Sequence, residues 1–222
     1  GHRSVRYEPV TWSQLLAFVV ATEALLIIPG PSVLFVISRG VTYGRRAAVA
    51  TVAGNTTGAA VQATLVAAGL GAVVATSTAV FTTMKVVGGA YLVWLGMKAW
   101  RDRRSLADAL RTGAEVPVRS TRQLLRDGFV VGVTNPKTTL FFLAVLPQFV
   151  RPEAGHPSLQ LLALGLLFCA QAMLSDGAYG VAAGSVRGWL ERSPKRIEAV
   201  GGTGAVVMVG LGVRMALTGR HD

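Results

Sequence analysis

The stretch that decides the fold is Val10–Ser38, VTWSQLLAFVVATEALLIIPGPSVLFVIS, an apolar run interrupted by Pro29-Gly30-Pro31. As one helix it would be about 43 Å long at about 1.5 Å per residue, which exceeds the bilayer hydrocarbon core of about 30 Å. Proline removes a backbone donor and disfavours helix at the residue before it. The run therefore predicts one membrane span made of two half-helices.

The composition of the 222-residue chain is also typical of a membrane protein. Hydrophobic residues make up 51% and charged residues only 15%, whereas soluble proteins carry about 25% charged residues. The net charge of +11 comes from basic residues between apolar runs, where they favour a role in topology over nucleic-acid binding. The six runs predict an all-α polytopic membrane protein with six transmembrane helices: Val10–Ser38, Ala47–Ala68, Ala79–Trp100, Asp127–Val150, Ser158–Val181 and Ile197–Leu217.

The basic residues also predict the orientation. Almost all of those between the runs lie in the first, third and fifth gaps. Because cytoplasmic loops carry the excess of lysine and arginine, both termini are expected outside the cytoplasm. The stretch Arg101–Arg126 is then the main cytoplasmic loop. Small residues at spacing four predict close helix packing, as in Gly54 with Gly58, Gly128 with Gly132, and Gly180 with Gly184 and Gly188.

A second interruption indicates an internal repeat. Asn135-Pro136-Lys137 interrupts the fourth run at nearly the depth of the first break, and residues 85–89 (KVVGG) align with residues 198–202 (EAVGG). Three spans are an odd number, so a second copy enters the membrane from the opposite side. We expect one transmembrane domain, 1–222, with two inverted three-helix repeats (about 10–100 and 127–217) joined by the basic loop 101–126. The alternative is that glycine and proline are simply common in membrane helices.

Interrupted helices offer binding groups inside the membrane. The N–H groups and positive dipole end of the second half-helix attract a carboxylate, and freed carbonyls suit an ammonium. Lys137 adds a positive charge, although it could instead reach the interface or pair with a buried acid. The candidate substrate-binding residues are Pro29, Gly30, Pro31, Ser32, Asn135, Pro136 and Lys137.

Two acidic residues lie within apolar runs, Glu23 and Asp176. A charge at the bilayer centre costs about 2.5 to 3.5 kcal/mol on insertion scales, so such residues are rarely without a role. Either could exchange a proton, and Asp176 is favoured because it lies deeper in its run; its alternative is a structural partner for Lys137. Asp127 and Glu198 begin their runs, where an acid complements the helix dipole, and are interpreted as structural.

Other polar and reactive residues predict no further chemistry. The polar residues of the second run are assigned to hydrogen bonds within the bundle; they include Asn55 and Gln62. Cys169 is the single cysteine, the three histidines lack metal-site spacing, and no phosphate-binding loop occurs. We therefore expect no metal, no cofactor, no ATP-driven step and no enzyme activity.

Several motifs together are similar to those of a known family. They are Pro29-Gly30-Pro31-Ser32, Arg39-Gly40, Gly44-Arg45-Arg46, Gly54, the segment Gly88 to Gly96 with Tyr91-Leu92, Gly128-Phe129, Asn135-Pro136-Lys137, Phe141-Phe142 and Pro147-Gln148-Phe149. Their order and spacing resemble the LysE/RhtB family of amino-acid exporters over about residues 12–217. The resemblance implies a secondary-active exporter of amino acids in the cell inner membrane that uses the proton gradient and forms a homodimer.

The sequence departs from the family pattern at Ser32. Many relatives have an acidic or amide residue there, so Glu23 or Asp176 would have to supply that function. The alternative to an exporter is a passive channel or uniporter for small zwitterionic solutes. Nothing in the sequence chooses among basic, branched and hydroxylated amino acids.

Overall fold

The computed structural model describes residues 12–27, 30–69, 78–112, 119–151, 154–186 and 193–217. Every regular element in these ranges is a helix. In chain order they are α1 (Trp12–Ile27), α2 (Pro31–Tyr43), α3 (Arg45–Ala67), α5 (Thr78–Thr112), α6 (Thr121–Val133), α7 (Pro136–Leu140), the π-helical turn η1 (Phe141–Val145), the 3-10 turn η2 (Leu146–Phe149), α8 (Pro157–Ser185) and α10 (Pro194–Leu217).

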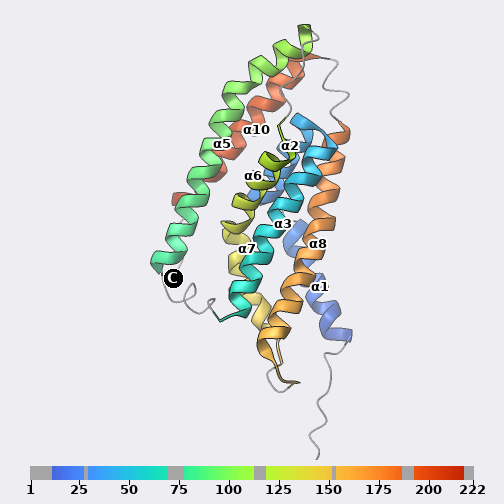
Figure 1. Cartoon of the computed structure of the whole chain (residues 1–222), viewed down its shortest axis with the longest axis vertical. Coiled ribbons are helices and arrows are strands. Elements are labelled where there is room, and N and C mark those ends of the chain that lie inside the picture. The colour runs from blue at the N-terminus through green and yellow to red at the C-terminus, as the bar shows by residue number, and fades with distance from the viewer. Residues whose placement is uncertain are drawn as a thin grey trace, which may run out of the picture.

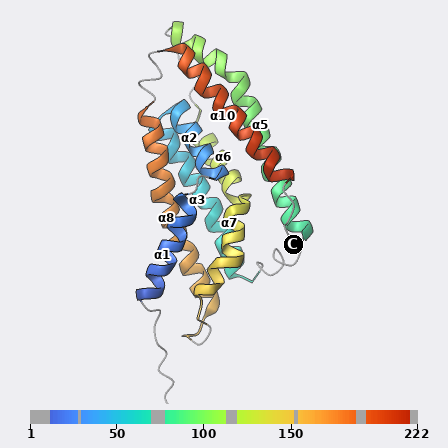
Figure 2. The same ribbon diagram turned by 180° about the vertical axis from the view of Figure 1, so that it is seen from behind.

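Helix α3 packs against both α6 and α8, and α8 lies on the side of the bundle away from α5 and α10 (Figure 1). Helices α2 and α6 lie toward one end of the pair α3 and α8, whereas α1 and α7 lie toward the other (Figures 1 and 2). The long helices α5 and α10 pack along each other on one flank. The two ends of the bundle are thus built from different halves of the interrupted helices.

Both interruptions occur where the sequence predicts them. Helix α1 ends at Ile27 and α2 begins at Pro31, with a bend of 59° between them; α6 and the helix from Pro136 to Phe149 meet at 43°. Each second half begins with a proline, whose missing donor and fixed φ suit the first helical position. Asn135 caps the second of them, because its side-chain oxygen accepts a hydrogen bond from the Lys137 N–H at 3.1 Å.

The stretch predicted as the cytoplasmic loop, residues 101–126, is partly helical. Helix α5 continues to Thr112 and α6 begins at Thr121. Residues 101–112 are mainly arginine, alanine and leucine, which favour helix. Ser120 and Gln123 form a capping box, each side chain accepting from the other's backbone N–H, which starts α6 before the apolar run.

At most three segments of the described chain are long and apolar enough to cross a membrane. By length and composition, α8 can cross a membrane alone, and each bent pair can do so as one span. Within the described residues, α5 and α10 hold shorter apolar segments, Val86–Lys98 and Ala205–Arg214. Helix α3 is rich in alanine, glycine and threonine, which lowers its hydropathy although one face is buried. The six-span inverted repeat stays a prediction.

Helices α3 and α6 pack backbone to backbone through glycine. A Cβ on Gly54 would overlap the Leu125 carbonyl, and one on Gly132 would overlap the Asn55 carbonyl. On the neighbouring pair, a Cβ on Gly40 of α2 would lie 2.6 Å from the Gly180 carbonyl of α8. The close packing predicted from small-residue spacing is confirmed for these described glycines; Gly188 lies outside the described residues.

At the end of the bundle where α2 and α6 lie, arginines surround a buried acid. Asp127 of α6 is fully buried and is contacted by Arg39, Arg119 and Arg126. We call this region the arginine end. Asp127 was expected at the start of a helix, and that interpretation was wrong in its placement, because α6 begins at Thr121 and places Asp127 inside the helix.

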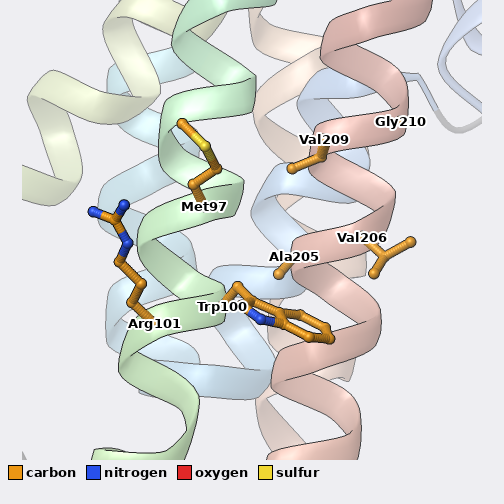
Figure 3. A pocket seen from close by; sticks show the side chains of 7 residues that line it. All are labelled: Met97, Trp100, Arg101, Ala205, Val206, Val209 and Gly210. Carbon is orange, nitrogen blue, oxygen red and sulfur yellow. The ribbon is translucent and has the colours of Figure 1, made fainter.

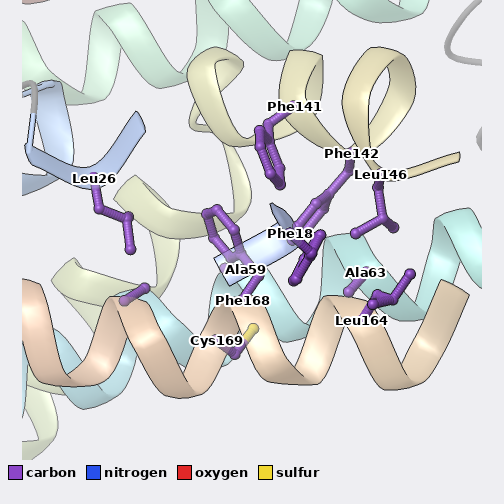
Figure 4. Packing of buried hydrophobic residues seen from close by; sticks show 11 residues of the cluster. Phe18, Leu26, Ala59, Ala63, Phe141, Phe142, Leu146, Leu164, Phe168 and Cys169 are labelled. Carbon is purple, nitrogen blue, oxygen red and sulfur yellow. The ribbon is translucent and has the colours of Figure 1, made fainter. Parts of the chain in front are cut away.

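The opposite end is packed with aromatic rings (Figure 4). Phe18 of α1 and Phe142 of η1 are fully buried, and the Phe168 ring of α8 stands 4.9 Å from the Phe142 ring in an edge contact. Phe141 and Phe149 complete the group, with ring centroids 6.2 and 5.2 Å from Phe18. We call this region the phenylalanine end.

Candidate functional site

A cavity of about 30 Å³ lies between the two breaks. Space of this size holds about one water molecule. Its walls come from both interrupted helices and from α3 and α8, and the lining residues are Leu25, Leu26, Gly30, Ser32, Val33, Asn55, Ala59, Asn135, Lys137, Thr138, Phe168, Ala172 and Asp176. The structure therefore brings Gly30, Ser32, Asn135, Lys137 and Asp176 of the predicted site together.

The two breaks bind each other directly. The Asn135 side-chain N–H donates to the Ser32 hydroxyl at 2.7 Å, so an amide reaches Ser32 from the other half of the chain. The Lys137 ammonium donates to the Leu25 carbonyl near the end of α1 at 2.6 Å. A Cβ at position 30 would lie 3.1 Å from the Lys137 Cδ, so Gly30 leaves room for the lysine stem. Lys137 thus joins the second break to the first.

Asp176 supplies a carboxylate on the opposite wall. It is 2% exposed, and its Oδ2 accepts a long hydrogen bond from the Asn55 side chain at 3.4 Å. The Asp176 Oδ1 and Asn55 Oδ1 atoms are buried and accept no hydrogen bond from the described residues. Buried acceptors are rarely left without a donor. The pair is therefore suited to a ligand that carries N–H groups, such as an ammonium.

The carbonyls freed by the second break already have a partner. Gln62 of α3 donates to the Gly132 carbonyl at 3.0 Å and to the Val133 carbonyl at 2.8 Å. Its own carbonyl oxygen accepts from the Thr139 hydroxyl at 3.1 Å. Gln62 therefore bridges both sides of the break, as bundle hydrogen bonding predicts, and these two carbonyls are occupied.

The remaining predicted residues lie outside the cavity wall. Glu23 on α1 accepts from the Ser175 hydroxyl at 2.9 Å and from the Gln171 amide at 3.3 Å, which ties α1 to α8. Pro31 and Pro136 begin their half-helices but do not line the cavity. Pro29 lies outside the described residues.

A second hollow lies between α5 and α10, with a volume of about 440 Å³ (Figure 3). Its lining is apolar except for one arginine: Met97, Trp100, Arg101, Ala205, Val206, Val209 and Gly210. It offers no carboxylate for an ammonium. Its chemistry suits apolar chains better than a zwitterion, so the cavity at the breaks is the candidate site.

Comparison with known proteins shows the family of the chain. The model of the LysE type translocator family matches residues 23–219. The chain belongs to the LysE type translocator family. That match includes both breaks, the lysine between them and the buried aspartate of α8. No solved structure matches the chain.

Relatives of this LysE type translocator include named efflux proteins. The chain is 31% identical over 192 residues to the homoserine/homoserine lactone efflux protein of Salmonella typhimurium, covering 86% of this chain and 90% of the relative. It is 26% identical to the leucine efflux protein of Klebsiella pneumoniae, covering 90% and 93%. A membrane protein of Vibrio cholerae is 39% identical over 151 residues, covering 68% and 71%.

Sequence reasoning missed the arrangement around Asp127. Asp127 was interpreted as an acid that complements a helix dipole, and its buried contact with Arg39, which lies far away in the sequence, was not predicted. The capping box of Ser120 and Gln123 is a sequence signal that places Asp127 inside the helix rather than at its start. The ion pairs themselves have no local signal.

Proposed function

We propose that this chain exports an amino acid across the cytoplasmic membrane and that the substrate binds in the cavity between the two breaks. The observation that carries this proposal is that one cation, Lys137, and one carboxylate, Asp176, line the same cavity. Membership of a translocator family and two relatives named as efflux proteins support it.

The bound substrate would replace contacts that the protein now makes with itself. Lys137 turns from the Leu25 carbonyl to the substrate carboxylate, and the substrate ammonium takes the acceptors of Asp176 and Asn55. The substrate ammonium gives the Asp176 and Asn55 oxygens the donors that they lack, whereas the Leu25 carbonyl gives up its donor. A charged solute inside a low-dielectric site requires such paired contacts at both of its charges. The present cavity is smaller than an amino acid, so binding requires the half-helices to separate.

The substrate side chain is proposed to be neutral. After the two ends of the zwitterion are bound, the lining offers no further acidic or basic side chain. What remains is apolar wall from Leu26, Val33 and Phe168, with hydroxyl and amide groups from Ser32, Asn135 and Thr138. A second substrate charge would lack a partner and would be disfavoured by burial.

Transport is proposed to be proton antiport through Asp176. A carboxylate that binds an ammonium in one access state can take a proton in the other, since the two positive partners compete for the same oxygens. The buried position of Asp176 and its free Oδ1 support this assignment. Glu23 is the comparison residue, because its carboxylate is already bound by Ser175 and Gln171.

We propose that the arginine end faces the cytoplasm and that both termini lie outside. This orientation follows from the positive-inside rule, since the first, third and fifth gaps hold nearly all of the basic residues between the runs. With it, α2 and α6 are the cytoplasmic halves of the two interrupted helices, and α1 and α7 are the outer halves.

The test is counterflow in proteoliposomes with a panel of labelled amino acids, repeated under an imposed pH gradient. We expect exchange of a neutral amino acid, with uphill movement when a proton gradient is present. In Asp176→Asn, uphill movement should be lost, whereas Glu23→Gln should retain it. Uphill transport by Asp176→Asn at the parent rate would contradict the antiport role.

Lys137→Met tests the carboxylate assignment, because methionine keeps most of the side-chain length without the charge. Apparent substrate affinity should fall by about tenfold or more, as for the loss of a buried charged hydrogen bond. Lys98→Met is the matched control, since the Lys98 ammonium lies over the exposed Trp94 ring at 5.6 Å. If amino acids equilibrate freely with no effect of the pH gradient, the chain is a uniporter or channel instead.

A further inference from the structure

Asp127 at the arginine end joins four parts of the chain through one carboxylate. Its Oδ2 accepts from Arg119 at 2.8 Å and lies 3.6 Å from the Arg39 Nη2 atom, and its Oδ1 accepts from the Tyr91 hydroxyl at 2.9 Å and from Arg126 at 3.2 Å. Arg39 comes from α2, Tyr91 from α5, and Arg119 from the segment before α6. Both halves of the chain therefore meet at this group.

The network is buried where ionic groups are expensive to keep. Asp127 has no exposed side-chain surface and Arg39 has 2%. Taking an ion pair out of water costs several kcal/mol per ion, so a buried pair is weak evidence for stability. Removing one partner is strongly unfavourable, however, because it leaves a charge unpaired. The ion pairs of such a group are therefore either formed or fully separated, because a partly separated pair leaves charges without partners.

The contacts of Arg39 differ from those of the other partners. Its Nε and Nη2 atoms donate no hydrogen bond to any of the described residues, and its guanidinium lies over the Phe35 and Tyr43 rings at 4.8 and 5.6 Å. Arg119 in contrast makes a short hydrogen bond to Asp127. Both rings belong to α2 itself, so at Asp127 helix α2 is held to α6 by charge at a longer distance, and this contact is the one that separates most easily.

The position of this contact relates it to the cavity. Helix α2 begins at the first break and α6 ends at the second, so both run from the candidate site to the arginine end. Between α6 and α3, Gly128 and Gly132 allow the backbones to touch, which leaves no width for a solute. A path along α2 and α6 from the cavity to this end requires these two helices to move apart, and that movement separates Arg39 from Asp127.

We propose that Asp127 is a positioning residue that latches α2 to α6, keeps the arginine end of the transport path closed, and releases Arg39 when that end opens. This inference rests on the proposed function in one respect, since it takes the cavity at the breaks as the place that the path must reach. It does not depend on which solute is transported.

The test measures the access of a thiol reagent to the cavity from each side of the membrane. Ala59, which lines the cavity, is changed to cysteine in a background of Cys169→Ala, and a membrane-impermeant maleimide is applied to inside-out and right-side-out vesicles. The exposed Arg46→Cys, in the same background, identifies which preparation presents the arginine end. No transported solute is needed, so failure of the exporter proposal would not affect this readout.

Asp127→Asn should raise the labelling rate of position 59 from the arginine side by about tenfold, in the range of ordinary coupling energies, and leave the rate from the other side unchanged. Tyr91→Phe removes one hydroxyl and keeps all ion pairs, so it should raise the rate from the same side by about threefold. Arg122→Gln is the matched control, because Arg122 is an exposed arginine of the same helix, and its labelling should equal that of the parent.

Two results would overturn the proposal. One is an unchanged rate from the arginine side in Tyr91→Phe and in Asp127→Asn. The other is an equal rise from both sides, which would indicate general loosening of the bundle. Should Asp127→Asn fail to fold, Tyr91→Phe decides the question alone, since it leaves every charge paired.

Discussion

The two ends of this bundle close the same cavity by different physical means. At the arginine end, glycines bring backbones into contact and a buried carboxylate joins α2, α5 and α6. At the phenylalanine end, large rings fill the space between α1, η1 and α8 (Figure 4). Backbone contact and ion pairs require one geometry, whereas rings can repack around a changed volume. The comparison predicts that the arginine end tolerates little change and the phenylalanine end more.

The π-helical turn η1, Phe141–Val145, strengthens this contrast. Short π-helical segments are rare and occur mostly at functional sites. This one lies in the outer half of the second interrupted helix and carries two rings of the phenylalanine end. No such irregularity occurs in α2 or in α6. The rings are therefore carried by the less regular backbone.

The largest effect is expected where a side chain is added at the arginine end. Gly54→Ala places a methyl group on the Leu125 carbonyl, so α3 and α6 must separate. We expect a loss of about 3 kcal/mol in stability, at the upper end for overpacking, measured as a lower melting temperature in detergent. Gly177→Ala in α8 is the control, because a Cβ there meets nothing within 4 Å, and it should melt like the parent. Equal melting of both variants would contradict the backbone contact.

A smaller effect is expected at the second break, which lies between the two ends. Gln62→Leu removes three hydrogen bonds across the break and leaves the Val133 carbonyl without a donor, whereas the Gly132 carbonyl and the Thr139 hydroxyl keep their bonds to Asn135. These losses should lower stability by about 2 kcal/mol. Thr64→Val on the same helix should change it by less than about 0.5 kcal/mol, since Thr64 is exposed and bonds only within its own helix. Chemical unfolding of the purified variants distinguishes these values.

The smallest effect is expected for a conservative change among the rings. Phe142→Leu keeps an apolar side chain at a fully buried position, and neighbouring rings can move into the space. We expect a loss of about 1 kcal/mol, and transport that continues. A collapse of folding as severe as that of Gly54→Ala would show that the two ends do not differ in tolerance.

The local features of the fold could be predicted from the sequence. Pro31 and Pro136 locate the two breaks because proline acts on its own helix, whatever surrounds it. The capping box of Ser120 and Gln123 also predicts the start of α6, but the apolar run alone places that start later. Helix ends depend on such caps rather than on hydropathy.

The contacts of the site could not be predicted in the same way. The contact of Lys137 with the Leu25 carbonyl, more than a hundred residues away in the chain, has no local signal in the sequence. The sequence predicts that Gln62 forms hydrogen bonds within the bundle, but it does not predict that Gln62 bridges a break. Such pairings depend on how helices from the two halves pack, which one sequence does not specify.

The most direct test of the account is a density map of the protein with a neutral amino acid bound. The account predicts density between the breaks, with the substrate carboxylate within hydrogen-bond distance of Lys137 and its ammonium on Asp176. Density for the amino acid in the hollow between α5 and α10, with the Lys137 contact to the Leu25 carbonyl unchanged, would contradict the account.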